Sequence, residues 1–189
     1  MASTYDAPAA GWQLFDTPVG PCGLAWDAEG RLAGSQLPEA DAAATAARMA
    51  RRFGPGPSVE APAAVQAWAE RLRGVMAGSG DRLDDIPVAD AAQPPFHRRV
   101  WALARAIPPG ETRRYGDLAA QLGGPGAARA VGQALGANPF APIVPCHRIL
   151  AAGGGAGGFS APGGTRTKLR LLELEGARFG SDAGQQNLF

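Results

Sequence analysis

Residues 115–136 read YGDLAAQLGGPGAARAVGQALG, and this stretch decides the interpretation of the second half of the chain. It predicts two short helices, Tyr115–Leu122 and Gly126–Gly136, because two glycines and a proline at residues 123–125 end the first of them. Two short helices joined by such a tight turn are typical of a helix-turn-helix unit.

A third helix precedes this pair. Phe96, Val100, Leu103 and Ile107 recur at helical spacing, and Pro108-Pro109-Gly110 ends the run. The amino-acid composition, the net charge and the spacing of apolar residues all change just before this helix, at Gln93-Pro94-Pro95. We therefore expect three parts, which are an N-terminal domain at residues 1–93, a second domain at residues 94–178, and a polar tail at residues 179–189.

The N-terminal part reads as an α/β unit. Strand-like runs at residues 12–16, 22–26 and 31–37 are separated by turn residues, and alanine-rich helices are predicted at residues 40–53 and 62–76. A further strand is expected at Leu83–Ile86. Cys22 lies in an apolar strand-like run, which favours a buried structural thiol.

Charge is divided unevenly along the 189 residues. The net charge is only +1, but residues 1–94 carry seven basic against twelve acidic side chains, and residues 95–180 carry eleven basic against four acidic ones. This asymmetry indicates a basic half that meets a polyanion, with chance surface charge as the alternative. No apolar run is long enough to span a membrane, the start of the chain lacks a secretory signal, and two cysteines make no disulfide framework. We therefore expect a cytoplasmic protein, associated with the nucleoid when it is bound to DNA.

The second helix of the pair is covered with small residues. Only Arg129 and Gln133 are long enough to reach a base edge or fill a base stack, while Ala128 and its neighbours allow close approach to a backbone. Such a helix predicts generic contact with DNA, including the minor groove. The alternative is an Ala/Gly face that packs against another helix.

A potentially reactive segment follows at residues 140–150, FAPIVPCHRIL. Cys146 directly precedes His147, and a neighbouring base activates a cysteine as a nucleophile. The adjacency of Cys146 and His147 is also compatible with a buried, unreactive cysteine. The glycine-rich run Gly153–Gly158 is predicted to be a loop, and it lacks the Lys-Ser/Thr of a phosphate-binding P-loop.

Together these motifs resemble one known family. Pro145-Cys146-His147-Arg148 is similar to the active-site signature of the O6-alkylguanine-DNA alkyltransferases, or methylated-DNA–protein-cysteine methyltransferases. The resemblance runs from Phe96 to about Gly176 and includes residues 99–101, 107–112, 115–119, 126–132, 136–139, 171–172 and 175–176. It implies an α+β fold, with a ribonuclease-H-like α/β domain followed by a winged helix-turn-helix alkyltransferase domain.

The resemblance also implies a catalytic role for five residues. Cys146 would accept the alkyl group, His147 would take the thiol proton through a bound water, and Glu175 would orient His147. Asn138 would brace the turn before the reactive segment. Tyr115 would donate a hydrogen bond to the departing guanine.

A second group of residues is implied to contact DNA or the base. Arg129 would replace the flipped nucleotide in the duplex, Ser160 would contact O6, and the backbone carbonyls of Cys146 and Ile149 would accept from the exocyclic amine. The other substrate-binding or DNA-binding residues expected on this basis are Ala128, Gln133, Ala141 and Phe159.

Three departures from the family pattern affect the pocket. The loop between Ser160 and Lys168 is about two residues longer than the common pattern, which leaves Glu173 as an alternative to Glu175. Phe159 replaces a frequent tyrosine. Ala141 replaces a proline that packs against bulky alkyl groups in some members. No Cys/His set matches the zinc site of some relatives, so neither a metal nor a cofactor is expected.

The implied function is direct-reversal DNA repair, a single irreversible transfer of the alkyl group from O6-alkylguanine, or from O4-alkylthymine, to Cys146. The expected partner is double-stranded or single-stranded DNA that contains alkylated bases. One alternative is a non-catalytic lesion-binding protein, which usually has tryptophan in place of the cysteine. Another is a winged-helix transcription regulator, which the sparse recognition helix disfavours.

The last five residues, QQNLF, resemble the short peptide by which bacterial DNA-processing proteins bind the replication sliding clamp. Leu188 and Phe189 would fill an apolar pocket, and Gln185 would form a hydrogen bond at its rim. The alternatives are a tail that packs on its own domain and a frayed chain end.

Overall fold

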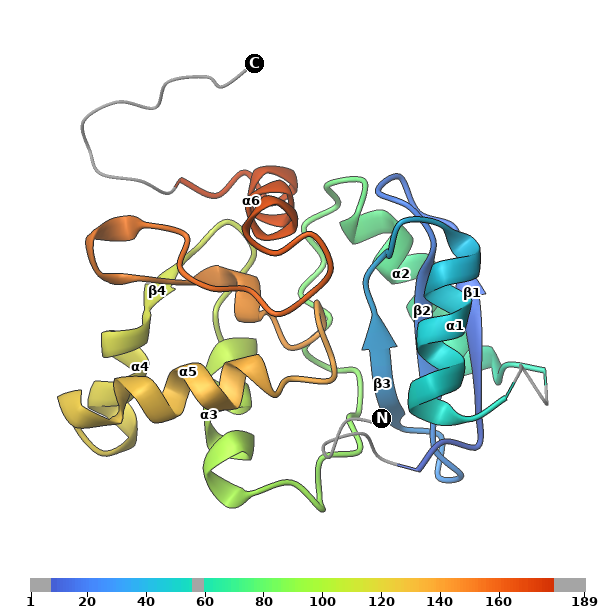
Figure 1. Ribbon diagram of the computed structural model, residues 1–189, viewed down its shortest axis with the longest axis horizontal. Helices are drawn as coiled ribbons and strands as arrows, with labels where there is room; N and C mark the ends of the chain where they lie inside the picture. Colours follow the sequence, from blue (N-terminus) through green and yellow to red (C-terminus); the bar gives the residue numbers. More distant parts are fainter. Residues whose placement is uncertain (1–7, 56–59, 179–189) are drawn as a thin grey trace.

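The computed structural model describes residues 8–55 and 60–178 and shows two halves packed side by side, one built on a sheet and one on helices (Figure 1). The elements are, in chain order, β1 Gly11–Phe15, β2 Cys22–Trp26, β3 Leu32–Gln36, α1 Ala42–Phe53, α2 Ala63–Val75, α3 Pro95–Arg105, β4 Arg113–Arg114, α4 Tyr115–Leu122, the 3-10 turn η1 Pro125–Ala127, α5 Ala128–Gly136, the 3-10 turn η2 Cys146–Arg148, β5 Ile149–Leu150, the 3-10 turn η3 Ala152–Gly154 and α6 Thr165–Leu174. The strands and helices predicted in the N-terminal part are thus confirmed up to residue 76.

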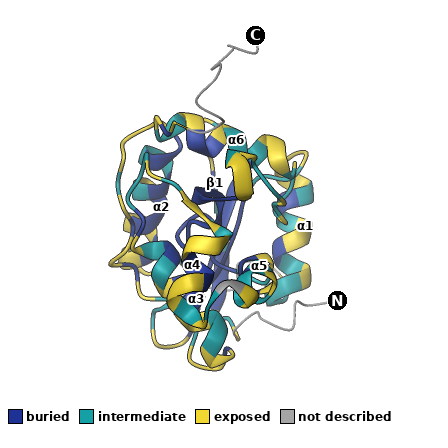
Figure 2. Ribbon diagram, turned by 90° about the vertical axis from the view of Figure 1, so that its left-hand side faces the viewer, coloured by how far each residue is buried: buried dark blue, intermediate teal, exposed yellow. Residues whose placement is uncertain are grey.

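The N-terminal sheet is an antiparallel meander in the order β1-β2-β3. Figure 2 shows it buried between α1 and α2, which cover opposite faces. On the α1 face, Gly23 leaves room for Met49, since a Cβ at Gly23 would lie 2.7 Å from the Met49 sulfur. On the α2 face, Trp68 joins the buried cluster that contains Leu24 and Cys22. Cys22 is therefore a buried thiol, as predicted.

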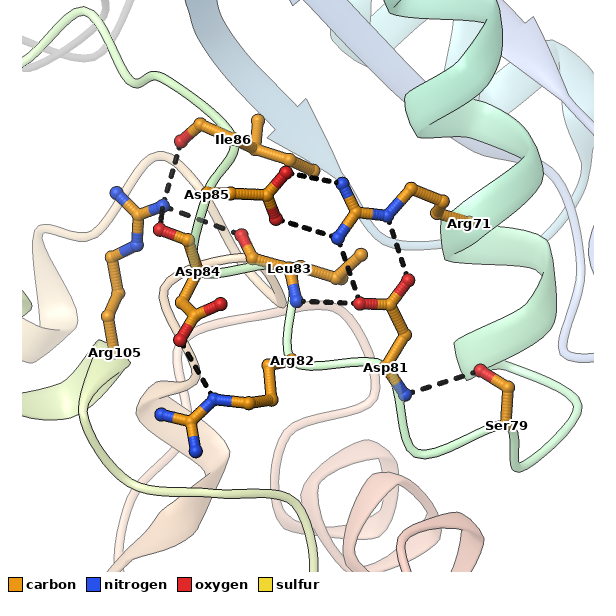
Figure 3. A network of polar contacts seen from close by, with 9 residues as sticks. All are labelled: Arg71, Ser79, Asp81, Arg82, Leu83, Asp84, Asp85, Ile86 and Arg105. Carbon is orange, nitrogen blue, oxygen red and sulfur yellow. Dashed lines mark hydrogen bonds and ion pairs between the residues drawn. The ribbon is translucent and has the colours of Figure 1, made fainter.

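The prediction of a strand at Leu83–Ile86 is wrong, because this segment is a turn. Leu83 has a φ of 56°, and the Asp81 carboxylate accepts its backbone N–H at 3.0 Å. The Arg105 guanidinium of α3 donates to the carbonyls of Leu83 (3.4 Å), Asp84 (2.5 Å) and Ile86 (2.8 Å), as Figure 3 shows. Carbonyls bound by one guanidinium in this way do not form the ladder of a strand.

Arg71 of α2 holds the other side of this turn. It makes paired hydrogen bonds to Asp81 (2.8 and 2.9 Å) and to Asp85 (2.7 and 2.9 Å), which Figure 3 also shows. The turn thus connects α2 of the first half to α3 of the second. Sheet pairing resumes only beyond it, as a parallel bridge between Leu32 and Val88.

In the C-terminal half, α3, α4 and α5 form a compact helical group. The Trp101 indole of α3 donates to the Ala134 carbonyl of α5 at 2.8 Å, and its ring meets Phe140 edge-on, with the centroids 5.7 Å apart. The helix predicted at residues 115–122 is confirmed as α4. The next one differs at its start, because η1 precedes the first α-helical residue, Ala128.

The two halves share one continuous core, in which Leu24 and Trp68 of the first join Trp101 and Phe140 of the second. The edge strand β3 is covered by the segment that follows α5. There the Ser35 N–H donates to the Pro139 carbonyl at 2.9 Å. The Ser35 hydroxyl donates to the Ala141 carbonyl at 2.7 Å. The predicted boundary at residues 93–94 lies directly before α3 and remains a prediction.

Across residues 8–55 and 60–178, the search for a helix that is both long enough and apolar enough to cross a membrane found none.

Candidate active site

The reactive segment is tied down by Asn138, two residues beyond the end of α5. Its side-chain oxygen accepts the Phe140 N–H at 2.9 Å, and its amide donates to the Val144 carbonyl at 2.8 Å. The same amide lies 3.3 Å from the Cys146 sulfur. Asn138 therefore braces the turn at both ends and also contacts the Cys146 sulfur.

The Cys146 thiol is almost fully enclosed, with 7% of the residue exposed. Burial raises the pKa of the thiol, and the hydrogen bond from Asn138 and the charge of Lys168 offset this only in part. At neutral pH the group is therefore a thiol rather than a thiolate. It needs a base before it can act as a nucleophile.

His147, Arg148 and Glu175 form a buried polar cluster next to this thiol. His147 Nε2 lies 2.9 Å from Glu175 Oε1, and Arg148 reaches the same carboxylate through Nε (3.0 Å) and Nη2 (2.7 Å). The remaining Arg148 nitrogen, Nη1, donates to the Ile107 carbonyl at 2.6 Å. Arg148 thereby joins η2 to the end of α3 and to the residue that follows α6.

Electrostatics set the proton positions in this cluster. Burial opposes ionisation of Glu175, but the bonds from His147 and Arg148 outweigh it and lower the pKa of the carboxyl to about 2. Burial also lowers the pKa of His147, so its imidazole is neutral at pH 7. Since the carboxylate only accepts, we assign the imidazole proton to Nε2. His147 Nδ1 is then the acceptor, and it is buried without a hydrogen-bond partner among the described residues.

The structure also distinguishes between the two candidate glutamates. Glu173 is exposed on α6 and lies 3.5 Å from Arg170, whereas only 4% of the Glu175 side chain is exposed. Gly110 makes room for this end of α6, because it has a φ of +82° and a Cβ there would lie 3.1 Å from the Glu175 carbonyl oxygen. Glu175 is therefore the residue that contacts His147, as predicted.

A cavity of about 460 Å³ opens at Cys146, and we call it the base pocket. Its lining residues are Tyr115, Gly132, Leu135, Gly136, Cys146, Gly158, Phe159 and Ser160. Tyr115 begins α4, and its hydroxyl lies 3.5 Å from the Gly158 carbonyl. Burial raises the pKa of Tyr115, so its hydroxyl keeps its proton. Ser160 donates to the Gly136 carbonyl at 3.2 Å. The structure thus brings the predicted residues Tyr115, Cys146, Phe159 and Ser160 to one cavity.

Sequence reasoning missed Lys168 as a member of this site. Its side chain is fully buried, and its amine donates to the Ile149 carbonyl at 2.5 Å and lies 5.9 Å from the centre of the Tyr115 ring. Burial lowers the pKa of this amine to about 8. Lys168 is the only lysine in the chain. The carbonyl of Ile149, expected to accept from guanine, already accepts from Lys168 and has one lone pair left.

The family of the chain follows from its overall similarity to solved structures. Residues 95–177 match the family described as 6-O-methylguanine DNA methyltransferase, DNA binding domain. The crystal structure of a variant of Mycobacterium tuberculosis OGT superimposes with a TM-score of 0.68 and 35% identity, over 92% of this chain and 96% of that one. The chain belongs to the O6-methylguanine-DNA methyltransferase family. Its α+β fold is that of the OGT structures.

Two further comparisons concern other members of this family. A methylated-DNA–protein-cysteine methyltransferase from Shigella flexneri is 46% identical over 107 residues, which is 57% of this chain and 61% of the relative. A structure of Mycobacterium tuberculosis OGT in complex with DNA superimposes with a TM-score of 0.67 and 36% identity, over 87% of this chain and 92% of that one. The sequence match therefore spans less than two thirds of the Shigella protein, while the structural match spans nearly the whole OGT chain.

The remaining predicted residues of the chain lie outside the base pocket. Arg129 and Gln133 are exposed one turn apart on α5, and Ala128 is half-buried at the start of that helix. Ala141 lines a second cavity, described below. Among the described residues, no group of three or more His, Cys, Asp and Glu side chains is placed to hold a metal ion.

Proposed function

We propose that this chain repairs DNA by direct reversal, taking the alkyl group of an O6-alkylguanine onto Cys146 in a single turnover. The observation that supports this most strongly is the position of the thiol. Cys146 lines a cavity of about 460 Å³ and directly precedes His147, whose Nδ1 has no partner among residues 8–55 and 60–178 and whose Nε2 is held by Glu175. Cys146, His147 and Glu175 are thus arranged as a nucleophile, the base that takes its proton and the group that orients this base.

The reaction follows from these positions. His147 Nδ1 takes the thiol proton through a water molecule, and the sulfur attacks the alkyl carbon. The carbon–O6 bond breaks as the carbon–sulfur bond forms, and the Tyr115 hydroxyl donates a hydrogen bond to the departing guanine. The proton taken from the thiol ends on guanine, so His147 and Tyr115 return to their starting protonation states. The product is a thioether at Cys146. No group in the described site is positioned to cleave it, so each molecule reacts once.

The proposed substrate is duplex or single-stranded DNA whose damaged base turns out into the base pocket, with O4-alkylthymine as a second lesion. Arg129, exposed at the start of α5, would fill the gap left in the duplex. The helices α3 to α5 support a winged helix-turn-helix description of the C-terminal half. The meander with one helix on each face supports a ribonuclease-H-like description of the N-terminal half.

The proposed function predicts a defined change in mass. Incubation with a duplex that contains O6-methylguanine should add one methyl group in place of one hydrogen to each protein molecule, and peptide mapping should locate it at Cys146. Unmodified protein that still binds the damaged duplex would instead identify a non-catalytic lesion-binding protein. Binding that depends on sequence and ignores the lesion would identify a transcription regulator.

We further propose that Gln185, Leu188 and Phe189 bind the bacterial sliding clamp. These residues lie outside the described part of the chain, and the support is their order and spacing alone. A fluorescent peptide of residues 183–189 should bind the clamp saturably, and replacing Leu188 and Phe189 by alanine should abolish binding. Binding that survives this double substitution, or no saturable binding by the original peptide, would disprove the proposal.

A further inference from the structure

A second cavity, of about 380 Å³, meets the base pocket at the nucleophile. Both cavities are lined by Gly136, Cys146, Phe159 and Ser160. The base pocket is otherwise built by α4, α5 and the loop at Gly158. The second cavity lies between the two halves of the protein, and we call it the side cavity. The N-terminal half therefore forms part of the surroundings of the reactive thiol.

The side cavity is polar where the N-terminal half lines it. Its lining residues from that half are Ser35, Gln36, Leu37, Glu39, Arg48 and Arg52. The cavity lining thus combines two arginines and one glutamate of the N-terminal half with Cys146 of the other half. The C-terminal half contributes Ala141, whose small side chain leaves space that a larger residue would fill.

The charged side chains of the side cavity differ in their contacts. The Arg52 guanidinium is bound by the carbonyls of Ser35 (2.7 Å) and Pro139 (3.3 Å) and by the Gln36 side-chain oxygen (3.0 Å). The Glu39 carboxylate accepts from the Gln36 amide at 3.2 Å. Arg48 stands one turn before Arg52 on α1, and it has no hydrogen bond or ion pair among the described residues. It is therefore free to bind a further anion.

We propose that the side cavity is a subsite for a negatively charged substituent on the O6 of guanine, and that Arg48 selects it. The inference rests on the proposed function. A base in its pocket presents the alkyl carbon to Cys146, and whatever else that carbon carries must fit beside the sulfur. The side cavity supplies this space, and Arg48 supplies a partner for a carboxylate there.

The reaction of a carboxymethyl group needs no additional reagent. The Cys146 sulfur bonds to the methylene carbon, the bond from that carbon to O6 breaks, and the thiol proton ends on guanine. The product is S-carboxymethylcysteine, whose carboxylate stays in the side cavity next to Arg48. An uncharged substituent of the same size fills the same space without this attraction.

The test compares two duplexes that differ only in this charge, one with O6-carboxymethylguanine and one with its neutral isostere, O6-(carbamoylmethyl)guanine. The single-turnover transfer rate for each is followed by the intact mass of the protein. In Arg48→Gln, the ratio of the charged to the neutral rate should fall about fivefold, the factor expected from losing one partly screened ion pair. The control is Arg51→Gln, an equally exposed arginine on α1 that does not line the side cavity. The Arg51→Gln variant should keep the same ratio of charged to neutral transfer rate as the unmodified protein.

The possible outcomes distinguish a failure of the subsite from a failure of the proposed function. A ratio that is the same in Arg48→Gln and in the unmodified protein overturns the subsite. An equal fall in Arg51→Gln also overturns it, because the effect would then reflect the general charge of α1. Failure of the unmodified protein to take a methyl group from O6-methylguanine overturns the proposed function itself. Normal methyl transfer with an unaltered ratio overturns the subsite alone.

Discussion

Replacing Cys146 with alanine should abolish alkyl transfer and leave the affinity for alkylated DNA within about twofold of its original value. The substitution removes the sulfur that forms the new bond, while Arg129 and Gln133 on the exposed face of α5 are untouched. Transfer of a radiolabelled methyl group to protein measures the first effect, and a mobility-shift titration with the same duplex measures the second.

Cys22 provides the matched control, because it is the only other cysteine in the chain. It lies in β2 within the core, where burial raises the pKa of its thiol to about 12. Cys22→Ala should therefore keep full transfer per folded molecule. Continued methyl transfer by Cys146→Ala, or its loss in folded Cys22→Ala, would show that Cys146 is not the acceptor.

Replacing Glu175 with glutamine should lower the free energy of unfolding by about 3–5 kcal/mol and slow the transfer step strongly. The substitution leaves the buried Arg148 guanidinium without its opposite charge, and removing one partner of a buried ion pair costs this much. The neutral amide also no longer holds His147 Nε2 as a carboxylate does. Chemical denaturation measures the stability, and single-turnover kinetics measure the rate. The control Glu173→Gln, at an exposed position, should change the stability by less than about 0.5 kcal/mol.

The same carboxylate predicts how stability depends on pH. The folded protein lowers the pKa of Glu175 from 4.5 to about 2, so its contribution is complete above about pH 4.5 and is lost as the pH falls towards 2. The gap in unfolding free energy between the unmodified protein and Glu175→Gln should therefore narrow by about 3 kcal/mol across this interval. A gap that stays constant from pH 6 to pH 2.5 would contradict the ionised Glu175.

Local patterns in the sequence determined most of the elements and the nucleophile. The helix at Tyr115–Leu122 was predictable to the residue, since glycines and a proline stop it within three positions. The three strands of the meander were predictable from short strand-like runs separated by turn residues. The Cys146-His147 pair was visible because its members are adjacent. Each of these signals lies within a few residues of the feature that it specifies.

Contacts between distant segments were decided only by the tertiary structure. Glu175 meets His147 across 28 positions and Ser35 meets Ala141 across 106, and neither spacing leaves a periodic signal. The segment Leu83–Ile86 looks like a strand by composition, but it forms a turn because Arg105, from another element, binds its carbonyls. Whether a side chain is buried depends on everything that packs around it. The choice of Glu175 over Glu173, the burial of Lys168 and the opening of a cavity beside Cys146 were therefore settled only when segments distant in the sequence packed against one another.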